Sequence, residues 1–284
     1  MTAATSASHA HPLPAGGTIP PMGLGTWMMG ERADSRAAEV AALQAGLDLG
    51  LTLIDTAEMY ASGAAEAVVG EAIRGRRDTV FLVSKVLPQN ASRRGTIQAC
   101  ERSLKRLGTD YIDLYLLHWD GPHLWADTRA AFADLVRAGK IRHWGVSNFD
   151  PAQMRGVWDG PAGADCATDQ VLYNLDRRGI EWDLLPEARR RTMPVMAYSP
   201  LEQARLLRHD ALVRAGRELG TSAAAVALAW LLAQPGVIPI PKSSSVERVQ
   251  EFRTALDLTL PGEISDRLDR AFPPPRAATP LAVL

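Results

Sequence analysis

Short apolar segments alternate with longer amphipathic segments along almost the whole chain. The short segments are rich in valine, isoleucine and leucine, which is typical of buried strands. The long segments repeat their apolar positions at three- and four-residue spacing, which predicts helices with one buried face. The predicted strands are Met22–Trp27, Leu51–Asp55, Thr79–Lys85, Tyr111–Trp119, Ile141–Asn148, Ala167–Tyr173, Pro194–Pro200 and Val237–Lys242.

A predicted helix follows nearly every strand. The helices are expected from Asp34 or Ser35 to Gly50, Ala64–Arg74, Ser92–Leu107, Trp125–Ala138, from Pro151 onward, Ile180–Arg190, from Thr221 as the cap to Ala233, and Ser243–Leu256. Alternation of this kind indicates a parallel sheet with helices outside it, and eight such units predict a (β/α)₈ barrel, the TIM barrel, in a single domain of residues 1–284. Within it, residues 1–19 are a lead-in and possible hairpin cap, and residues 271–284 are a C-terminal tail.

The alternative fold is an open, doubly wound sheet. That fold carries G-x-G-x-x-G after its first strand, where it binds a dinucleotide. Here the segment from Gly23 to Met28 lacks the third glycine. The barrel is therefore favoured.

Composition narrows the possible partners. The chain has 284 residues, 46% of them hydrophobic, and a formal net charge of −1. Because nucleic acids and anionic membranes require a basic face, we expect neither as a partner. No apolar run reaches the roughly 20 residues of a membrane span, and the first residues do not resemble a secretion signal, so we expect a cytoplasmic protein.

The sequence predicts no metal site. Cys100 lies on the apolar face of a predicted helix and Cys166 opens a predicted strand, so both are expected to be buried, reduced thiols. His9 and His11 could bind a metal, but a solvated N-terminal tail is the favoured interpretation.

Polar and aromatic side chains stand at the carboxyl ends of all eight predicted strands. They are Thr26, Trp27, Asp55, Lys85, His118, Ser147, Asn148, Gln170, Tyr198, Ser199 and Lys242. In a parallel barrel these ends meet on one face, where active sites form. The sequence therefore predicts a pocket there.

Four residues in this region can carry out proton transfer together. They are Asp55, Tyr60, Lys85 and His118. A free tyrosine titrates near pH ~10, and a neighbouring ammonium such as Lys85 would lower that value. Asp55 would hold Lys85, and His118 would bond a substrate oxygen. Each residue alone has a simpler structural interpretation, as a barrel ion pair or as packing, and only the ordered set on successive strands favours catalysis.

A second group of residues predicts an anion site. Lys242 precedes three serines at a predicted helix start, and Arg248 follows one turn later. A helix N-terminus and a guanidinium both bind phosphate well. The alternative is a solvated helix start.

Taken together, these motifs resemble the aldo-keto reductase superfamily. The resemblance rests on GLTLIDTAEMY, FLVSK, LYLLHW, GVSNF, QVLY, AYSPL and IPKSSSVERV, and spans residues 20–270. Among its groups, the chain is most similar to the bacterial methylglyoxal reductases. The resemblance implies a barrel that binds NADPH at its mouth without a Rossmann domain. It also implies that Tyr60 is the general acid, tuned by Lys85 and Asp55, while His118 orients the carbonyl.

The resemblance further implies a set of cofactor contacts for NADPH/NADP+. These are Gly25, Thr26, Trp27, Asp55, Ser147, Asn148, Gln170, Tyr198, Ser199, Pro200, Leu201, Gln203, Ile240, Lys242, Ser243, Ser244, Ser245, Arg248, Glu251 and Phe252. Within this set, Ser147, Asn148 and Gln170 would hold the carboxamide, and Tyr198 would stack on the nicotinamide. Two positions depart from the family pattern. Phe252 stands where asparagine is frequent, and Asp169 stands where asparagine is usual, so Asp169 must be neutral or turned away.

Aromatic residues are the candidate walls of the substrate pocket. Trp27, Tyr60, His118 and Trp119 are expected to contact substrate, while Trp125 could line the pocket or pack against outer helices. The connection from Pro200 to a helix near Asp210 is short, which favours a small carbonyl substrate.

The sequence therefore favours NADPH-dependent reduction of small aldehydes or 2-oxoaldehydes by a monomer. Two alternatives stay open: a nucleotide-sensing binding subunit, and a sugar or polyol dehydrogenase working in the oxidative direction.

Overall fold

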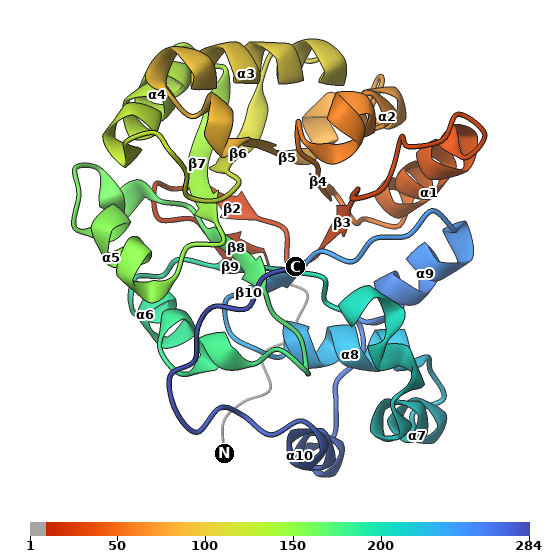
Figure 1. Cartoon of the computed structure of the whole chain (residues 1–284). Coiled ribbons are helices and arrows are strands. Elements are labelled where there is room, and N and C mark those ends of the chain that lie inside the picture. Colours follow the sequence, from red (N-terminus) through yellow and green to blue (C-terminus); the bar gives the residue numbers. More distant parts are fainter. Residues whose placement is uncertain (1–9) are drawn as a thin grey trace.

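Eight parallel strands close into a barrel with helices around it, as Figure 1 shows. The structure is a computed structural model and describes residues 10–284. The barrel strands are β3 (Gly23–Gly25), β4 (Leu53–Asp55), β5 (Phe81–Val86), β6 (Ile112–Leu117), β7 (Ile141–Ser147), β8 (Asp169–Leu172), β9 (Val195–Tyr198) and β10 (Val237–Pro239). They pair in chain order, and Gly25 N donates to Pro241 O at 2.9 Å where the first and last strands meet. The predicted barrel is confirmed.

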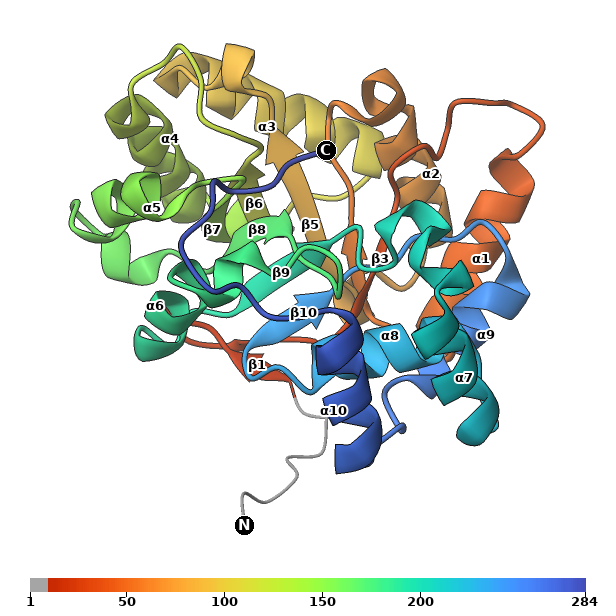
Figure 2. The same cartoon turned by 60° about the horizontal axis from the view of Figure 1, so that its bottom comes forward.

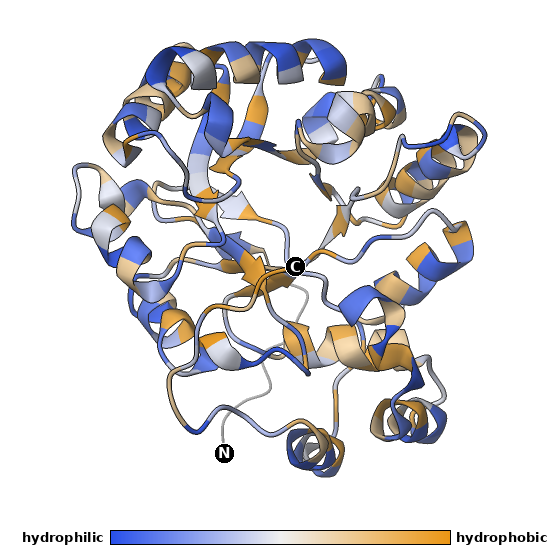
Figure 3. Ribbon diagram, in the orientation of Figure 1, coloured by the Kyte–Doolittle hydropathy of each residue, from blue (hydrophilic) through white to orange (hydrophobic). Residues whose placement is uncertain are grey.

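Helices surround the barrel between successive strands. They are α1 (Arg36–Asp48), α2 (Ala64–Ala72), α3 (Arg93–Leu107), α4 (Trp125–Arg137), α5 (Pro151–Trp158), α6 (Leu184–Arg190), α7 (Asp210–Glu218), α8 (Ala223–Leu232), α9 (Val246–Thr254) and α10 (Gly262–Ala271). Short 3₁₀ turns cover Tyr60–Gly63, Arg77–Thr79, Pro88–Asn90, Gly163–Asp165, Gly179–Glu181, Glu202–Ala204 and Leu206–Arg208. Most of these helices turn apolar residues toward the barrel and polar residues outward, as Figure 3 shows.

The barrel has an inner core that is distinct from the outer core between sheet and helices. The inner core consists of Leu13, Ile19, Leu53, Val83, Leu114, Leu116, Ala167, Met196, Ile238 and Ile240. Side chains alternate between the two faces of a strand. Asp55 therefore points inward two residues after Leu53, as Lys85 does after Val83 and Tyr198 after Met196. These polar side chains form a second layer inside the barrel, directly above the apolar layer of the inner core.

A hairpin closes the amino-terminal end of the barrel. Strands β1 (His11–Pro12) and β2 (Thr18–Ile19) pair antiparallel, and Figure 2 shows them at the end opposite the C-terminus. Leu13 and Ile19 are buried in the inner core, so the hairpin fills the barrel from below. Of the two histidines that could bind a metal, His9 lies outside the described residues and His11 belongs to β1.

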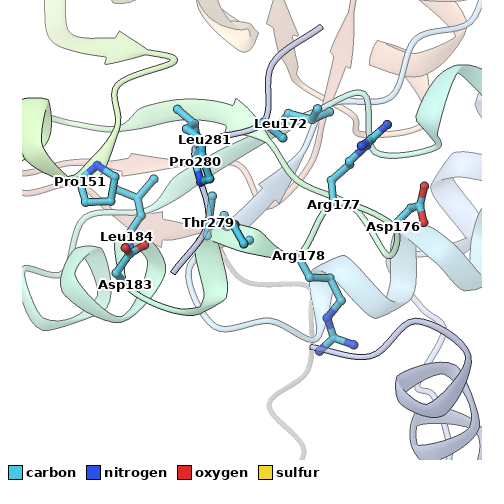
Figure 4. A pocket seen from close by; sticks show the side chains of 13 residues that line it. Pro151, Leu172, Asp176, Arg177, Arg178, Asp183, Leu184, Thr279, Pro280 and Leu281 are labelled. Carbon is cyan, nitrogen blue, oxygen red and sulfur yellow. The ribbon is translucent and has the colours of Figure 1, made fainter. Parts of the chain in front are cut away.

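The C-terminal tail crosses the carboxyl-end face of the barrel (Figures 1 and 2). Arg178 anchors its base, because Nη1 donates to Asp269 Oδ1 at 2.7 Å and to Phe272 O at 2.6 Å. A cavity of about 190 Å³ lies under Thr279, Pro280 and Leu281, and Figure 4 shows these residues between Pro151 and Arg177.

Several predicted helix bounds are wrong. Ser222, not Thr221, caps α8, because its side chain accepts from Ala225 N at 3.1 Å. The helix expected over Ile180–Arg190 divides in two, since the Asp183 side chain accepts from Leu184 N and starts α6 anew. Helix α10 was not predicted, since its buried face has few apolar residues, chiefly Ile264 and Leu268.

Among residues 10–284, no helix is both long and apolar enough to cross a membrane.

Candidate active site

A buried ion pair lies at the centre of the barrel mouth. The Lys85 side chain is 0% exposed, and its Nζ donates to both carboxylate oxygens of Asp55 at 2.8 Å. A third bond goes to the backbone oxygen of Thr56 at 2.9 Å. Ions taken out of water need such complete pairing, so this geometry keeps both groups charged. Strands β4 and β5 are neighbours, which is why residues far apart in sequence meet here.

Gln170 on β8 donates a further hydrogen bond to the Asp55 carboxylate. Its Nε2 donates to Asp55 Oδ1 at 2.7 Å across the barrel. The sequence placed Gln170 only among the cofactor contacts, although its position at an inward strand end pointed to the same pocket. The bond ties the charged pair to the opposite wall and restricts the carboxylate's orientation.

Tyr60 lies beside the pair, in the turn after β4. Its Oη is 3.4 Å from Lys85 Nζ, a long hydrogen bond, and the ammonium is 5.0 Å from the ring centroid. Burial raises the pKa of Tyr60 more than the Lys85 ammonium lowers it. The predicted lowering of the Tyr60 pKa by Lys85 is present, but the prediction left out burial, which outweighs it. Lys85 instead offsets part of the burial, and the phenol stays protonated and able to donate.

The Lys85 ammonium is retained despite its burial. Burial lowers the pKa of Lys85, but the Asp55 carboxylate and Tyr60 raise it more, so the net shift is upward. A charged ammonium beside a neutral phenol results.

His118 stands on the other side of Tyr60. The two rings are 5.8 Å apart at 74°, and the Trp119 ring lies 4.8 Å from the imidazole. Burial, with a smaller contribution from the Lys85 charge, lowers the pKa of His118 well below its usual value. The imidazole is therefore neutral, and its Nδ1 has no hydrogen-bond partner among residues 10–284. A neutral imidazole can donate one N–H to a substrate oxygen.

Polar residues of β7, β8 and β9 form a connected wall. Ser147 Oγ donates to Gln170 O at 2.7 Å, and Asn148 Nδ2 donates to His118 O at 3.2 Å. Tyr198 Oη donates to Asn148 Oδ1 at 2.9 Å. Asn148 has a left-handed backbone (φ 58°), which turns its amide back across the barrel mouth. On the facing side, Thr26 Oγ1 donates to Asp55 O at 2.9 Å.

Asp169 is both turned away and neutral. Because Gln170 points inward, Asp169 points outward, where its Oδ1 accepts from Phe149 N at 3.4 Å. Burial raises the pKa of Asp169 well above its usual value, and Oδ2 has no partner in the part of the chain that the structure describes. No charge therefore reaches the barrel mouth from this position.

The predicted anion group gathers at the start of α9. Ser245 caps the helix by accepting from Arg248 N at 3.4 Å, and Ser243 Oγ accepts from Ser245 N at 3.1 Å. Lys242, Arg248 and Glu251 are exposed, and Ser244 is half-buried. Two cations, hydroxyls and a helix N-terminus are a donor set that fits a phosphate monoester.

The remaining predicted cofactor positions divide by burial. Gly25, Leu201 and Ile240 are buried, while Gln203 is exposed in the loop after β9, next to the half-buried Ser199. Phe252 is 3% exposed and belongs to the outer core, so it faces the barrel and not the Arg248 surface. The prediction that Phe252 contacts the cofactor is therefore not supported.

The aromatic residues separate into rim and core. Trp27 is 47% exposed at the rim, and Trp119 is half-buried against His118. Trp125 instead packs on Phe132, Trp144 and Phe149, with ring centroids 5.7–6.4 Å apart. Of its two alternatives, the structure supports packing in the outer core.

The arrangement suits one kind of chemistry. A neutral phenol beside an ammonium can give a proton to an oxygen that becomes negative, and a neutral imidazole can position that oxygen. Within residues 10–284, no three histidine, cysteine or acidic side chains come together as a metal site.

Comparisons with known proteins agree with this geometry. The model of the Aldo/keto reductase family matches residues 21–272. Methylglyoxal reductase YeaE of Escherichia coli is 53% identical over 269 residues, which cover 93% of this chain and 95% of that protein. The crystal structure of an aldo/keto reductase from Klebsiella pneumoniae with NADP and acetate is 50% identical, with a TM-score of 0.94 over 97% of this chain and 99% of that chain. A structure from the same organism in complex with NADPH has a TM-score of 0.95, 50% identity, and coverage of 98% and 99%.

Proposed function

The chain belongs to the aldo/keto reductase family, and on that premise we propose that it reduces small aldehydes and 2-oxoaldehydes such as methylglyoxal. Membership makes it an NADP(H)-dependent oxidoreductase. The observation that carries the proposal is the buried Asp55–Lys85 pair with Tyr60 Oη at 3.4 Å and His118 beside it. The 53% identity to a methylglyoxal reductase supports the substrate class.

The residues of the mouth fit NADPH. Lys242, Ser243 and Arg248 would hold the 2′-phosphate, since this donor set suits a dianionic phosphate. Ser147 and Asn148 would hold the carboxamide, and Tyr198 would stack on the nicotinamide. When bound, the cofactor supplies hydride to the carbonyl carbon.

Tyr60 is the proposed proton donor. Its hydroxyl is neutral because burial raises the pKa of Tyr60, and Lys85 next to it stabilises the phenolate left after donation. Asp55 and Gln170 keep Lys85 in place. His118, neutral and close to Tyr60, would donate to the carbonyl oxygen and fix its position.

The rim is consistent with a small substrate. Trp27, Tyr60, His118 and Trp119 would form apolar walls above a polar floor, and the connection from β9 to α7 is short, so no long loop is available to close over a large substrate. We infer further that the protein acts in the cytoplasm as a monomer.

The direct test is NADPH oxidation by purified protein offered methylglyoxal or a simple aromatic aldehyde, with NADH in parallel. We expect turnover with NADPH well above that with NADH, and loss of this preference in Arg248→Met. Equal turnover with both cofactors would remove the phosphate-site assignment and leave the chemistry. Tight NADPH binding with no turnover across many carbonyls would favour a nucleotide-sensing subunit, and turnover only of polyols with NADP+ would favour the oxidative direction.

A matched variant tests the proton donor. Tyr60→Phe removes one hydroxyl from a half-buried ring, so the fold and NADPH affinity are expected to persist. The turnover number should fall by about 10²–10⁴, the typical contribution of general acid catalysis. Full activity in this variant would remove Tyr60 from the mechanism.

A further inference from the structure

The loop after β9 has an unusual backbone. Ser199, Glu202, Gln203 and Ala204 all have left-handed φ values, 49°, 48°, 53° and 69°. Residues with a Cβ adopt this region at a cost, which glycine avoids, and they persist there only where surrounding contacts hold them. Something in the structure must therefore fix this loop.

The side chain that fixes it is Glu202, which is 1% exposed. Its Oε2 accepts from Asn174 Nδ2 at 2.6 Å. Its Oε1 accepts from Arg177 Nε and Nη2 at 3.0 and 2.9 Å, and from Arg205 Nη2 at 2.5 Å. Both oxygens thus accept hydrogen bonds.

These contacts join two loops that are separate in sequence. Asn174 and Arg177 lie in the loop after β8, where Figure 4 shows Arg177 beside the tail. Asn174 Nδ2 also donates to Ser199 O at 3.0 Å, so one amide contacts two of the left-handed residues, Ser199 and Glu202. The β8 loop is itself rigid here, since Asn174 Oδ1 accepts from the backbone N of Asp176 and of Arg177 at 2.9 and 3.1 Å.

The hydrogen-bond donors around Glu202 keep its carboxylate ionised. Burial raises the pKa of Glu202, but hydrogen bonds from Asn174, Arg177 and Arg205 lower it more, so the carboxylate is ionised. Two guanidiniums face the one buried carboxylate, so the charge of Glu202 is compensated within the cluster.

We propose that Glu202 is a positioning residue for cofactor binding, holding the loop of residues 199–204, with its four left-handed residues, in the conformation that receives the cofactor's pyrophosphate. This rests on the proposed function and on the family resemblance, which implies that Ser199 to Gln203 line the pyrophosphate. Glu202 itself touches no reacting atom. It acts through the backbone of its own loop and through Arg177 and Arg205.

The test compares three variants by the dissociation constant for NADPH, measured by quenching of tryptophan fluorescence. Glu202→Gln keeps the size of the side chain but removes the charge that holds two arginines. Hydrogen bonds to a charged group are strong, so we expect the constant to rise about tenfold or more. Arg177→Met, which removes one half-exposed partner, should raise it about threefold. Glu218→Gln, on the surface at the end of α7, should leave it unchanged.

A second readout separates positioning from general stability. The turnover number at saturating NADPH should stay within about twofold of the wild type in all three variants, because the Tyr60 site is untouched. If Glu202→Gln fails to fold, the NADPH affinity of Arg177→Met alone tests the proposal.

Unchanged NADPH affinity in Glu202→Gln and Arg177→Met would overturn the inference, as would a loss of turnover with unchanged affinity. Absence of NADPH binding in the wild type is a different result, since it would defeat the proposed function as well.

Discussion

Inside the barrel, the Lys85 ammonium and the Asp55 carboxylate stabilise each other's charge. Replacing Lys85 with methionine leaves the Asp55 carboxylate buried with only Gln170 as donor. Removal of one partner of a buried pair costs roughly 3–5 kcal/mol. We expect a loss of this order in the free energy of unfolding, measured with urea, together with loss of activity.

The double variant gives the control for this prediction. Asp55→Asn with Lys85→Met removes both charges, so its loss of stability should be smaller than the sum of the two single losses. Additive losses would show that the two charges do not depend on each other.

Asp169 predicts a pH dependence of stability. Because burial raises the pKa of Asp169 in the folded chain, folding favours the neutral carboxyl. Its stabilising effect is complete below the unfolded pKa, near ~3.9, and declines as pH rises through the folded value. Asp169→Asn cannot ionise, so its stability relative to the wild type should increase from pH 5 to pH 8.

Urea midpoints at the two pH values measure this difference. Asp48→Asn, on an exposed carboxylate paired with Arg76, serves as the surface control. A flat difference for Asp169→Asn would mean that the buried carboxyl is already ionised in the folded chain at pH 5, which would contradict a raised pKa.

Among the elements, helix α8 offers a direct test of a cap. Ser222 accepts from Ala225 N, whereas the neighbouring Thr221, which the sequence favoured, makes no such bond. Ser222→Ala should lower the free energy of unfolding by about 1 kcal/mol, the usual value for a lost N-cap. Thr221→Ala should change it much less. Equal losses in thermal unfolding would contradict the assignment.

Helices with clear capping residues at both ends were predicted well, and helices without such residues were not. Ser92 and Gly108 mark the ends of α3 in the sequence, and the structure has them as its N-cap and left-handed C-cap. Helix α10 has neither a polar cap nor a full apolar face, so its pattern was too weak to recognise. The orientation of Asp169 could have been predicted, since strand alternation turns it away once Gln170 points inward.

The meeting of the candidate catalytic residues could be predicted because strand ends are fixed by the barrel, but loop contacts could not. Asp55, Lys85 and His118 follow from their positions in β4, β5 and just after β6. The Glu202 contacts depend instead on left-handed backbone in one loop and on Asn174 in another, and neither leaves a mark in the hydrophobic pattern. The roles of the cofactor residues remain predictions.

At the scale of the whole molecule, the hairpin is part of the inner core. Ile19 is fully buried and packs in the barrel interior with Leu13. Ile19→Ala should destabilise the protein by roughly 2–5 kcal/mol, as for other large-to-small changes in a core. Because the site lies at the other end, the turnover number of the folded variant should be unchanged, which steady-state kinetics below the melting temperature can measure. A matching loss of turnover would mean that the hairpin also shapes the site.

The polar layer of the site lies two residues further along each strand than the apolar layer. Each strand therefore has a fixed register of inward and outward positions. A one-residue insertion ahead of Leu53 would exchange the two faces of β4. Ile54 would then enter the barrel beside Lys85, and the Asp55 carboxylate would be pressed into the apolar layer under the helices. Such an insertion would damage core and site together. Length changes compatible with activity are therefore confined to the connections between strands, and the strands themselves must change by substitution alone.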